Sequence, residues 1–334
     1  MKDISVILPV YNGSQFMESC IQSIKTAGDR ILEILVVDDG STDDTLQTAQ
    51  NLSEIYPELR ILHTENHGIY TARKSGIAAA RGKYIAFIDV DDRYCQNALN
   101  ILTELLEKTN ADIAIGKCIS INSYDEEPPA AETCITMKEF PAAEIWPRIM
   151  RWKTQEYICY CVNRLYKKNV LEDLIEADHI SQGEDVLITC QVFQKAKKVV
   201  ETSQTVYLYY QNENSITHKY FSQHDLELIR VWDTICELMK DNPDVYYMAQ
   251  INRWRTDFTL ICRLVLADDR ELENAFAENL QGWRNSLREH YGEIMRARSM
   301  PVNRLLVITC LRFAFTPTKL LMQTAQAIRQ GKKR

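Results

Sequence analysis

The segment Ile85-Ala-Phe-Ile-Asp-Val-Asp-Asp-Arg-Tyr94 is the most informative part of this chain, because an apolar strand pattern runs directly into three carboxylates. Residues two apart on a strand share a face, so Asp89 and Asp91 can project together where the strand ends. Two carboxylates on one face repel unless a cation lies between them, and hard oxygen ligands suit Mg²⁺ or Mn²⁺. The pattern predicts a metal and diphosphate site, although an isolated Asp-x-Asp also fits a polar turn.

The composition is that of a soluble globular protein with an uneven charge distribution. The chain has 334 residues, 46% of them apolar and 25% charged, which is enough for one large or two ordinary domains. Its net charge of −7 argues against nucleic-acid binding as a main function. No acidic residue follows Glu293, and nine Lys or Arg lie in residues 294–334, so the tail carries +9 and the rest of the chain −16.

The cysteines and the N-terminal residues indicate a cytoplasmic protein. Ten cysteines include no Cys-x-x-Cys pair, and several, such as Cys20 and Cys190, lie in apolar surroundings, which is typical of reduced thiols. Met1-Lys-Asp3 leads directly into a strand pattern without the apolar region of a signal peptide.

Strand and helix patterns alternate in the first part of the chain. Apolar runs predict strands at 4–8, 31–37, 59–63 and 84–88, and amphipathic spacing predicts a helix between each pair. This alternation predicts an α/β fold with a mostly parallel, doubly wound sheet and helices on both of its faces.

Polar segments follow three of these predicted strands. Ligands of doubly wound sheets bind beyond the carboxyl ends of the strands. Pro9-Val-Tyr11, Asp38-Asp39 and Asp89-x-Asp91 all fall at such ends. We therefore expect them to meet at one rim of the sheet.

Two other enzyme classes with related folds fit the sequence less well. A dinucleotide-binding dehydrogenase would carry Gly-x-Gly-x-x-Gly after its first strand, where this chain has Pro-Val-Tyr-Asn-Gly13. A phosphatase with an aspartyl nucleophile would carry its Asp-x-Asp after the first strand and a Thr or Ser where Arg93 stands.

Several segments in a specific order resemble the family 2 glycosyltransferases of the GT-A fold. The resemblance is continuous over about the first 95 residues and extends more thinly to about residue 218. The matching segments are Ser5-Val-Ile-Leu-Pro-Val-Tyr-Asn12, Val36-Val-Asp-Asp-Gly-Ser-Thr-Asp43, Asn66-x-Gly68, Ala72-Arg73, Gly76-Ile77, Gly82-x-Tyr84-Ile85 and Phe87-Ile-Asp-x-Asp-Asp92.

The resemblance implies a role for each matching position. Asp39 would hydrogen-bond the nucleotide base, typically uracil, between Pro9 and Tyr11. Asp91 would be the main ligand of Mn²⁺ or Mg²⁺, and Asp89 would orient the ribose or the sugar.

The basic residues of the predicted donor site are Arg73 and Lys74. The family's usual Ala-Arg-Asn is Ala72-Arg73-Lys74 here, which keeps a basic partner in place. We expect Arg73 to pair with a phosphate or with Asp39, although its position also fits a surface arginine on a helix.

Gly183-Glu-Asp-Val-Leu187 resembles the family's acidic motif beside the acceptor. An inverting transfer is a single displacement, so a carboxylate must take the proton of the attacking hydroxyl. By resemblance, Asp185 is the predicted base and Glu184 positions it or the acceptor. The alternative is an acidic first turn that complements the helix dipole.

Ser215-Ile-Thr-His218 resembles the family's loop after its closing strand. His218 is a candidate metal or phosphate ligand, although a single histidine in a polar loop is more often simply solvated.

The chain beyond about residue 220 changes to continuous helical patterns. We expect a catalytic domain at 1–220 and a helical region at 221–334. The apolar stretch from Leu305 to Met322 is interrupted by Arg312, Pro317 and Lys319, so it does not predict a spanning helix. It fits an interfacial helix on an anionic inner membrane leaflet, or equally packing in a bundle or a homodimer.

Together these features predict a metal-dependent, inverting glycosyltransferase. It would transfer a sugar from a nucleotide-sugar, such as a UDP-sugar, to a glycan or polyprenyl-linked acceptor during surface polysaccharide synthesis. Two alternatives are a nucleotidyltransferase, whose glycine- and lysine-rich loop is missing near the first strand, and a non-catalytic scaffold with a degenerate site.

Overall fold

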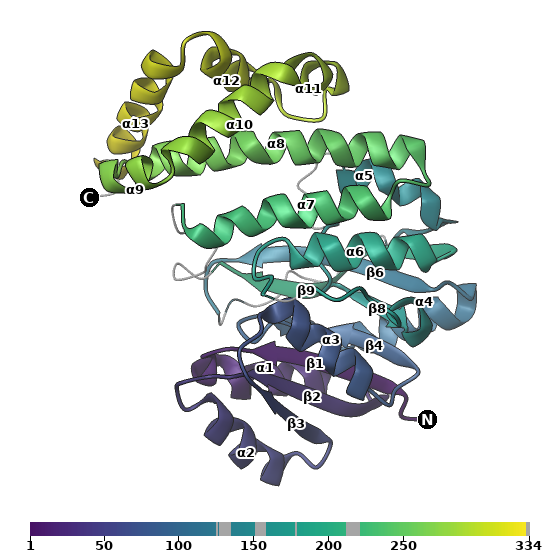
Figure 1. Ribbon diagram of the computed structural model, residues 1–334. Helices are drawn as coiled ribbons and strands as arrows, with labels where there is room; N and C mark the ends of the chain where they lie inside the picture. The colour runs from purple at the N-terminus through teal and green to yellow at the C-terminus, as the bar shows by residue number, and fades with distance from the viewer. Residues whose placement is uncertain (125, 127–134, 151–157, 178, 212–220, 332–334) are drawn as a thin grey trace. The chain divides into compact units, whose positions relative to one another are not determined.

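A computed structural model describes residues 1–124, 126, 135–150, 158–177, 179–211 and 221–331 (Figure 1). The chain divides into two compact units. The first comprises Met1–Ile145 and Tyr157–Ser215, and the second comprises Trp146–Glu156 and Ile216–Arg334. The boundary expected from the sequence was residue 220, whereas the second unit begins at Ile216 and also includes the short segment Trp146–Glu156.

The first unit is built on one mixed sheet whose order is β3-β2-β1-β4-β8-β6-β9-β5, with β7 also paired to β9. Its strands β1 to β4 are parallel to one another, as are β6 and β9. Strand β8 is antiparallel to both of its neighbours. The strands are β1 Ile4–Val10, β2 Ile31–Asp39, β3 Leu59–Thr64, β4 Tyr84–Phe87, β5 Arg93–Tyr94, β6 Ile113–Ile121, β7 Met137–Pro141, β8 Arg164–Lys167 and β9 Lys198–Tyr210.

Helices cover this sheet on both faces, as predicted. Strand β1 is buried at every residue, which requires cover on both sides. Helix α1 contacts α4, and α3 contacts α6, while α3 also packs on β1 and β2 (Figure 1). The helices are α1 Ser14–Ala27, α2 Thr45–Ile55, α3 Ile69–Ala79, α4 Ala98–Thr109 and α6 Glu184–Lys195.

The packing of α3 on β1 is unusually close. A Cβ at Gly76 would lie 2.5 Å from Cγ2 of Ile7, so only glycine allows this approach. Gly76 lies about one turn after Arg73 on the same helix. The close contact therefore fixes the depth at which the Arg73 side chain enters the protein.

The second unit is helical in its described part. Its longest helix, α8, contacts α5, α7, α10, α11 and α13. Asn242 caps α8 by accepting a hydrogen bond from the amide of Val245, and Pro243 occupies its first turn. The helices are α5 Trp146–Met150, α7 Glu227–Leu238, α8 Pro243–Ala267, α9 Arg270–Ala275, α10 Ala277–Glu289, α11 Tyr291–Ala297, α12 Val302–Phe313 and α13 Phe315–Gly331.

A core of apolar side chains from α8, α10 and α12 holds this unit together, including Leu264, Trp283 and Ile308. Of the helices that the structure describes, none has the length and apolar character needed to cross a bilayer.

Candidate active site

The acidic turn after β4 is anchored by the phenol of Tyr207 on β9. Tyr207 donates a hydrogen bond to Oδ2 of Asp92 at 2.7 Å and accepts one from the amide of Asp89 at 3.1 Å. The second oxygen of Asp92 accepts from the amide of Tyr210 at 2.9 Å. Asp92 is buried, and burial together with the charges of Asp89 and Asp91 raises its pKa well above the ordinary value. Asp92 therefore holds the turn. Asp89 and Asp91 lie in the same turn and are half-buried.

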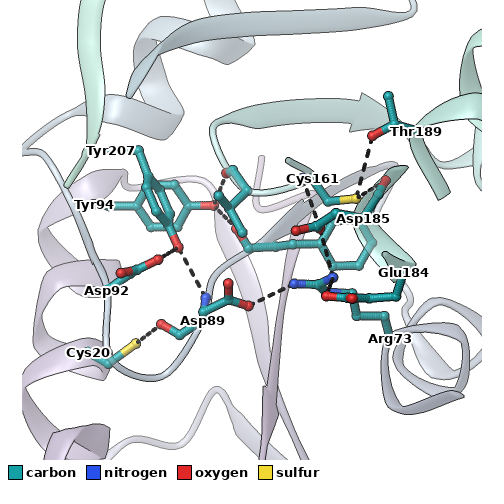
Figure 2. Close-up of polar contacts among 12 residues, drawn as sticks. Cys20, Arg73, Asp89, Asp92, Tyr94, Cys161, Glu184, Asp185, Thr189 and Tyr207 are labelled. Atoms are coloured by element: carbon teal, nitrogen blue, oxygen red, sulfur yellow. Dashed lines mark hydrogen bonds and ion pairs between the residues drawn. The ribbon is translucent and has the colours of Figure 1, made fainter. Parts of the chain in front are cut away.

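Arg73 on α3 joins this turn to the start of α6. Its side chain is fully buried (0% exposed), and Nη2 donates to Oδ1 of Asp89 at 2.8 Å. Nη1 donates to Oδ1 of Asp185 at 2.8 Å and to Oε1 of Glu184 at 3.3 Å. Figure 2 shows the guanidinium between the two groups of carboxylates. The surrounding carboxylates raise the pKa of Arg73 against the effect of burial.

The predicted pairing of Arg73 with Asp39 is therefore replaced by these three contacts. Asp39 instead accepts hydrogen bonds from the amides of His67 and Gly68, at 2.9 and 2.8 Å. Gly68 has a φ of +90°, which suits glycine, and it directly precedes α3. Asp39 thus shapes the turn that leads into the helix of Arg73.

The carboxylates at the start of α6 have different surroundings. Oδ1 of Asp185 also accepts a hydrogen bond from the amide of Cys161 at 3.2 Å, in addition to that from Arg73. Burial and the neighbouring charge of Asp185 raise the pKa of Glu184 to about 8, although Arg73 acts in the opposite direction. Glu184 therefore releases its proton at a higher pH than an ordinary glutamate does.

The first two loops at the rim are tied together by Asn12. The backbone amide of Asn12 donates to Oγ of Ser41 at 3.0 Å, and its side-chain Oδ1 accepts from the backbone amide of Thr42 at 2.8 Å. Pro9 lies within β1 opposite Val37, and the side chain of Tyr11 is 51% exposed. The structure thus brings the segments of Pro9, Tyr11 and Asp39 together at the carboxyl ends of β1 and β2.

One predicted site residue, Lys74, is not part of this cluster. Lys74 contacts Glu176 and the carbonyl oxygen of Ile175. His218 lies outside the described residues. Their roles in donor and metal binding stay predictions.

The oxygen ligands at this site suit a divalent cation whose coordination is completed by the substrate. Asp89 and Asp91 offer hard oxygen atoms, and the surrounding carboxylates outnumber the positive charge of Arg73. In the described part of the chain, no three His, Cys, Asp or Glu side chains form a ready-made metal site. Mg²⁺ is commonly held by one or two carboxylates and the phosphates of a substrate, so this arrangement fits such an ion.

The supporting roles of Tyr207 and the Cys161 amide are not predicted by the sequence motifs. Tyr207 lies 115 residues from Asp92, and Cys161 lies 24 residues from Asp185. No local pattern marks either contact, since both depend on how segments distant in the sequence pack together.

Known proteins share this fold. The model of the family "Glycosyl transferase family 2" matches residues 5–175, just over half of the chain. The uncharacterized glycosyltransferase EpsJ of Bacillus subtilis is 30% identical over 219 residues, which cover 64% of this chain and 62% of EpsJ. The uncharacterized glycosyltransferase YibD of Escherichia coli is 25% identical over 259 residues, covering 73% of this chain and 74% of YibD.

A solved structure shares the fold. Residues 1–349 of S. aureus TarS, crystallised in complex with UDP-GlcNAc, superpose with a TM-score of 0.63 at 19% identity, covering 98% of this chain and 92% of that one. The match to EpsJ spans less than two thirds of its length. The chain belongs to glycosyltransferase family 2.

Proposed function

We propose that this protein is a metal-dependent, inverting glycosyltransferase that uses a nucleotide-sugar, most simply a UDP-sugar, as donor. The observation that carries this proposal is the placement of one guanidinium, Arg73, between Asp89 and the pair Glu184 and Asp185. Arg73 thereby holds Asp89, which is suited to the donor side, close to Glu184 and Asp185, which are suited to the acceptor side. A single displacement needs both sides close together.

The donor would bind along the rim formed by β1, β2 and the turn after β4. Asp39 would accept from the nucleotide base, with Pro9 and Tyr11 beside it. Arg73 and Lys74 would supply positive charge toward the diphosphate. The TarS complex with UDP-GlcNAc supports a nucleotide-sugar donor, and a hexosyl or N-acetylhexosaminyl group is the expected cargo.

A Mn²⁺ or Mg²⁺ ion would be held by Asp91 and Asp89, with His218 as a further candidate ligand. When bound, such an ion stabilises the negative charge that develops on a leaving diphosphate. Burial and the charge of Asp185 raise the pKa of Asp89, although Arg73 acts in the opposite direction.

Asp185 would accept the proton of the acceptor hydroxyl while that oxygen attacks the anomeric carbon. The bond from the anomeric carbon to the diphosphate oxygen breaks in the same step, and the nucleoside diphosphate leaves with the electron pair. Arg73 and the Cys161 amide hold Asp185 in position. Glu184, with its raised pKa, would orient the acceptor or Asp185 through a hydrogen bond.

The acceptor is proposed to be a glycan or a polyprenyl-linked sugar used for cell-surface polysaccharide. Such an acceptor is made at the cytoplasmic face of a membrane, so we place the enzyme there. Donor binding and chemistry are tested separately from this location.

The test is a thermal-shift screen of the full chain against nucleotide-sugars with Mn²⁺ or Mg²⁺, followed by measurement of nucleoside diphosphate release. We expect one donor class to raise the melting temperature only when the cation is present, and to be hydrolysed slowly. If no nucleotide-sugar shifts the melting temperature or is turned over with either ion, the proposal is wrong.

A further inference from the structure

Helix α12 has two apolar faces, of which only one is used inside the protein. Ile308 and Leu311 are buried in the core of the second unit. Val302, Leu306 and Phe313 are instead exposed, although their spacing of four and seven residues places them together on another face. A helix that only completes a bundle needs one apolar stripe.

Helix α13 repeats this arrangement. Met322 packs against the core, whereas Leu320, Leu321 and Ile328 are exposed. Lys319 is turned toward Glu273 on α9. Every exposed side chain that the structure describes on α13 is uncharged.

The exposed apolar side chains of the described chain are concentrated on these two helices. Twelve large apolar residues are exposed in the described part of the chain, and six of them lie on α12 and α13, each 56–73% exposed. These consecutive helices contact one another. Exposed apolar groups gathered in this way mark an interaction surface.

The charge of the segment distinguishes between the possible occupants. Residues 294–334 carry nine Lys or Arg and no acidic residue. A second copy of the chain on this surface would bring two segments of charge +9 together, which is unfavourable. An anionic lipid surface is complementary both to this charge and to the apolar side chains.

We infer that the outer face of α12 and α13, formed by Val302, Leu306, Phe313, Leu320, Leu321 and Ile328, docks on an anionic phospholipid bilayer. The apolar side chains enter the boundary between headgroups and acyl chains, and Arg312, whose guanidinium lies 5.1 Å from the ring centroid of Phe313, lies near the headgroups. This inference rests on the proposed location of the enzyme at a membrane, but not on its donor or its catalytic residues.

The test is co-sedimentation of the full chain with vesicles of phosphatidylcholine alone or mixed with phosphatidylglycerol. We expect binding to the mixed vesicles that weakens with added salt, and little binding to phosphatidylcholine. The double variant Leu306→Gln/Leu321→Gln should bind at least about tenfold more weakly, because two apolar side chains no longer leave water. The matched control Ile55→Gln, at an exposed isoleucine of the first unit, should bind like the wild type.

Three results would overturn the inference. They are no binding to either vesicle, equal binding to both, or binding that the double variant does not weaken. A wild-type dimer in light scattering that becomes monomeric in the double variant would show that a second copy covers this face instead. The thermal shift with nucleotide-sugars should be unchanged in the double variant, so failure of the docking surface is distinguishable from failure of the proposed enzyme activity.

Discussion

Arg73 and Asp185 lie 2.8 Å apart, although 112 residues separate them in the chain. The same guanidinium reaches Asp89 at 2.8 Å with its other terminal nitrogen. A side chain expected to face a phosphate thus bridges carboxylates from two parts of the fold.

Replacing Arg73 with alanine should destabilise the protein strongly. The change leaves three partly buried carboxylates without their shared cation, which costs about 3–5 kcal/mol. Denaturant unfolding of the donor-free protein measures this loss. Lys74→Ala is the control, since its pair with the exposed Glu176 is worth about 0–1 kcal/mol. Equal losses in the two variants would contradict the bridging role.

Replacing Asp91 with asparagine should abolish metal-dependent transfer and leave the fold intact. Loss of one charged ligand should lower the turnover number by about a hundredfold or more. The measurement is turnover against Mn²⁺ concentration, together with the melting temperature. Asp29→Asn removes one exposed carboxylate elsewhere and should retain activity. Full activity of Asp91→Asn would remove the metal-site proposal.

Replacing Asp185 with asparagine should separate binding from chemistry. We expect donor affinity to be retained and transfer to be lost in single-turnover experiments, because the proton acceptor is gone. The control is Asp244→Asn, which removes an acidic residue from the first turn of α8 and should leave transfer unchanged. Unaltered turnover of Asp185→Asn would refute its role as base.

Glu184 should make stability depend on pH. Its pKa in the folded protein, about 8, is above the ordinary value of 4.5, so the folded state binds more protons than the unfolded state between these values. The free energy of unfolding should therefore fall as pH rises from about 4.5 to about 8. The melting temperature of Glu184→Gln should fall less over this range, and parallel curves for the two proteins would rule out the raised pKa.

Replacing Tyr207 with phenylalanine should weaken both the fold and the site. The change removes the hydroxyl that bonds Asp92 and the Asp89 amide, at a cost of about 1–3 kcal/mol. Tyr94→Phe is a matched loss, since its hydroxyl is also buried but donates to the carbonyl of Phe87. Only Tyr207→Phe should weaken cation-dependent donor binding. An equal effect in both variants would indicate a purely structural role.

Most of the first unit could be predicted from the sequence, and the site only in part. The alternation of apolar strands with amphipathic helices predicted the sheet and its cover on both faces. The antiparallel position of β8 was not predicted, because no local pattern states which neighbour a strand will pair with. The partners of Arg73 were predicted incorrectly in the case of Asp39, whose oxygens face the amides of His67 and Gly68.

The amino-acid sequence was sufficient to identify the family and the positions of the acidic turns, because strand periodicity and ordered short motifs are local properties. It also determined the basic charge of the last segment, because charge is a property of composition. Three relationships became apparent only in the three-dimensional structure: Arg73 joins Asp89 to Asp185, Tyr207 anchors Asp92, and α12 and α13 keep a second apolar face exposed. These relationships depend on which distant segments pack together, and burial and the pKa of a side chain arise only from that packing.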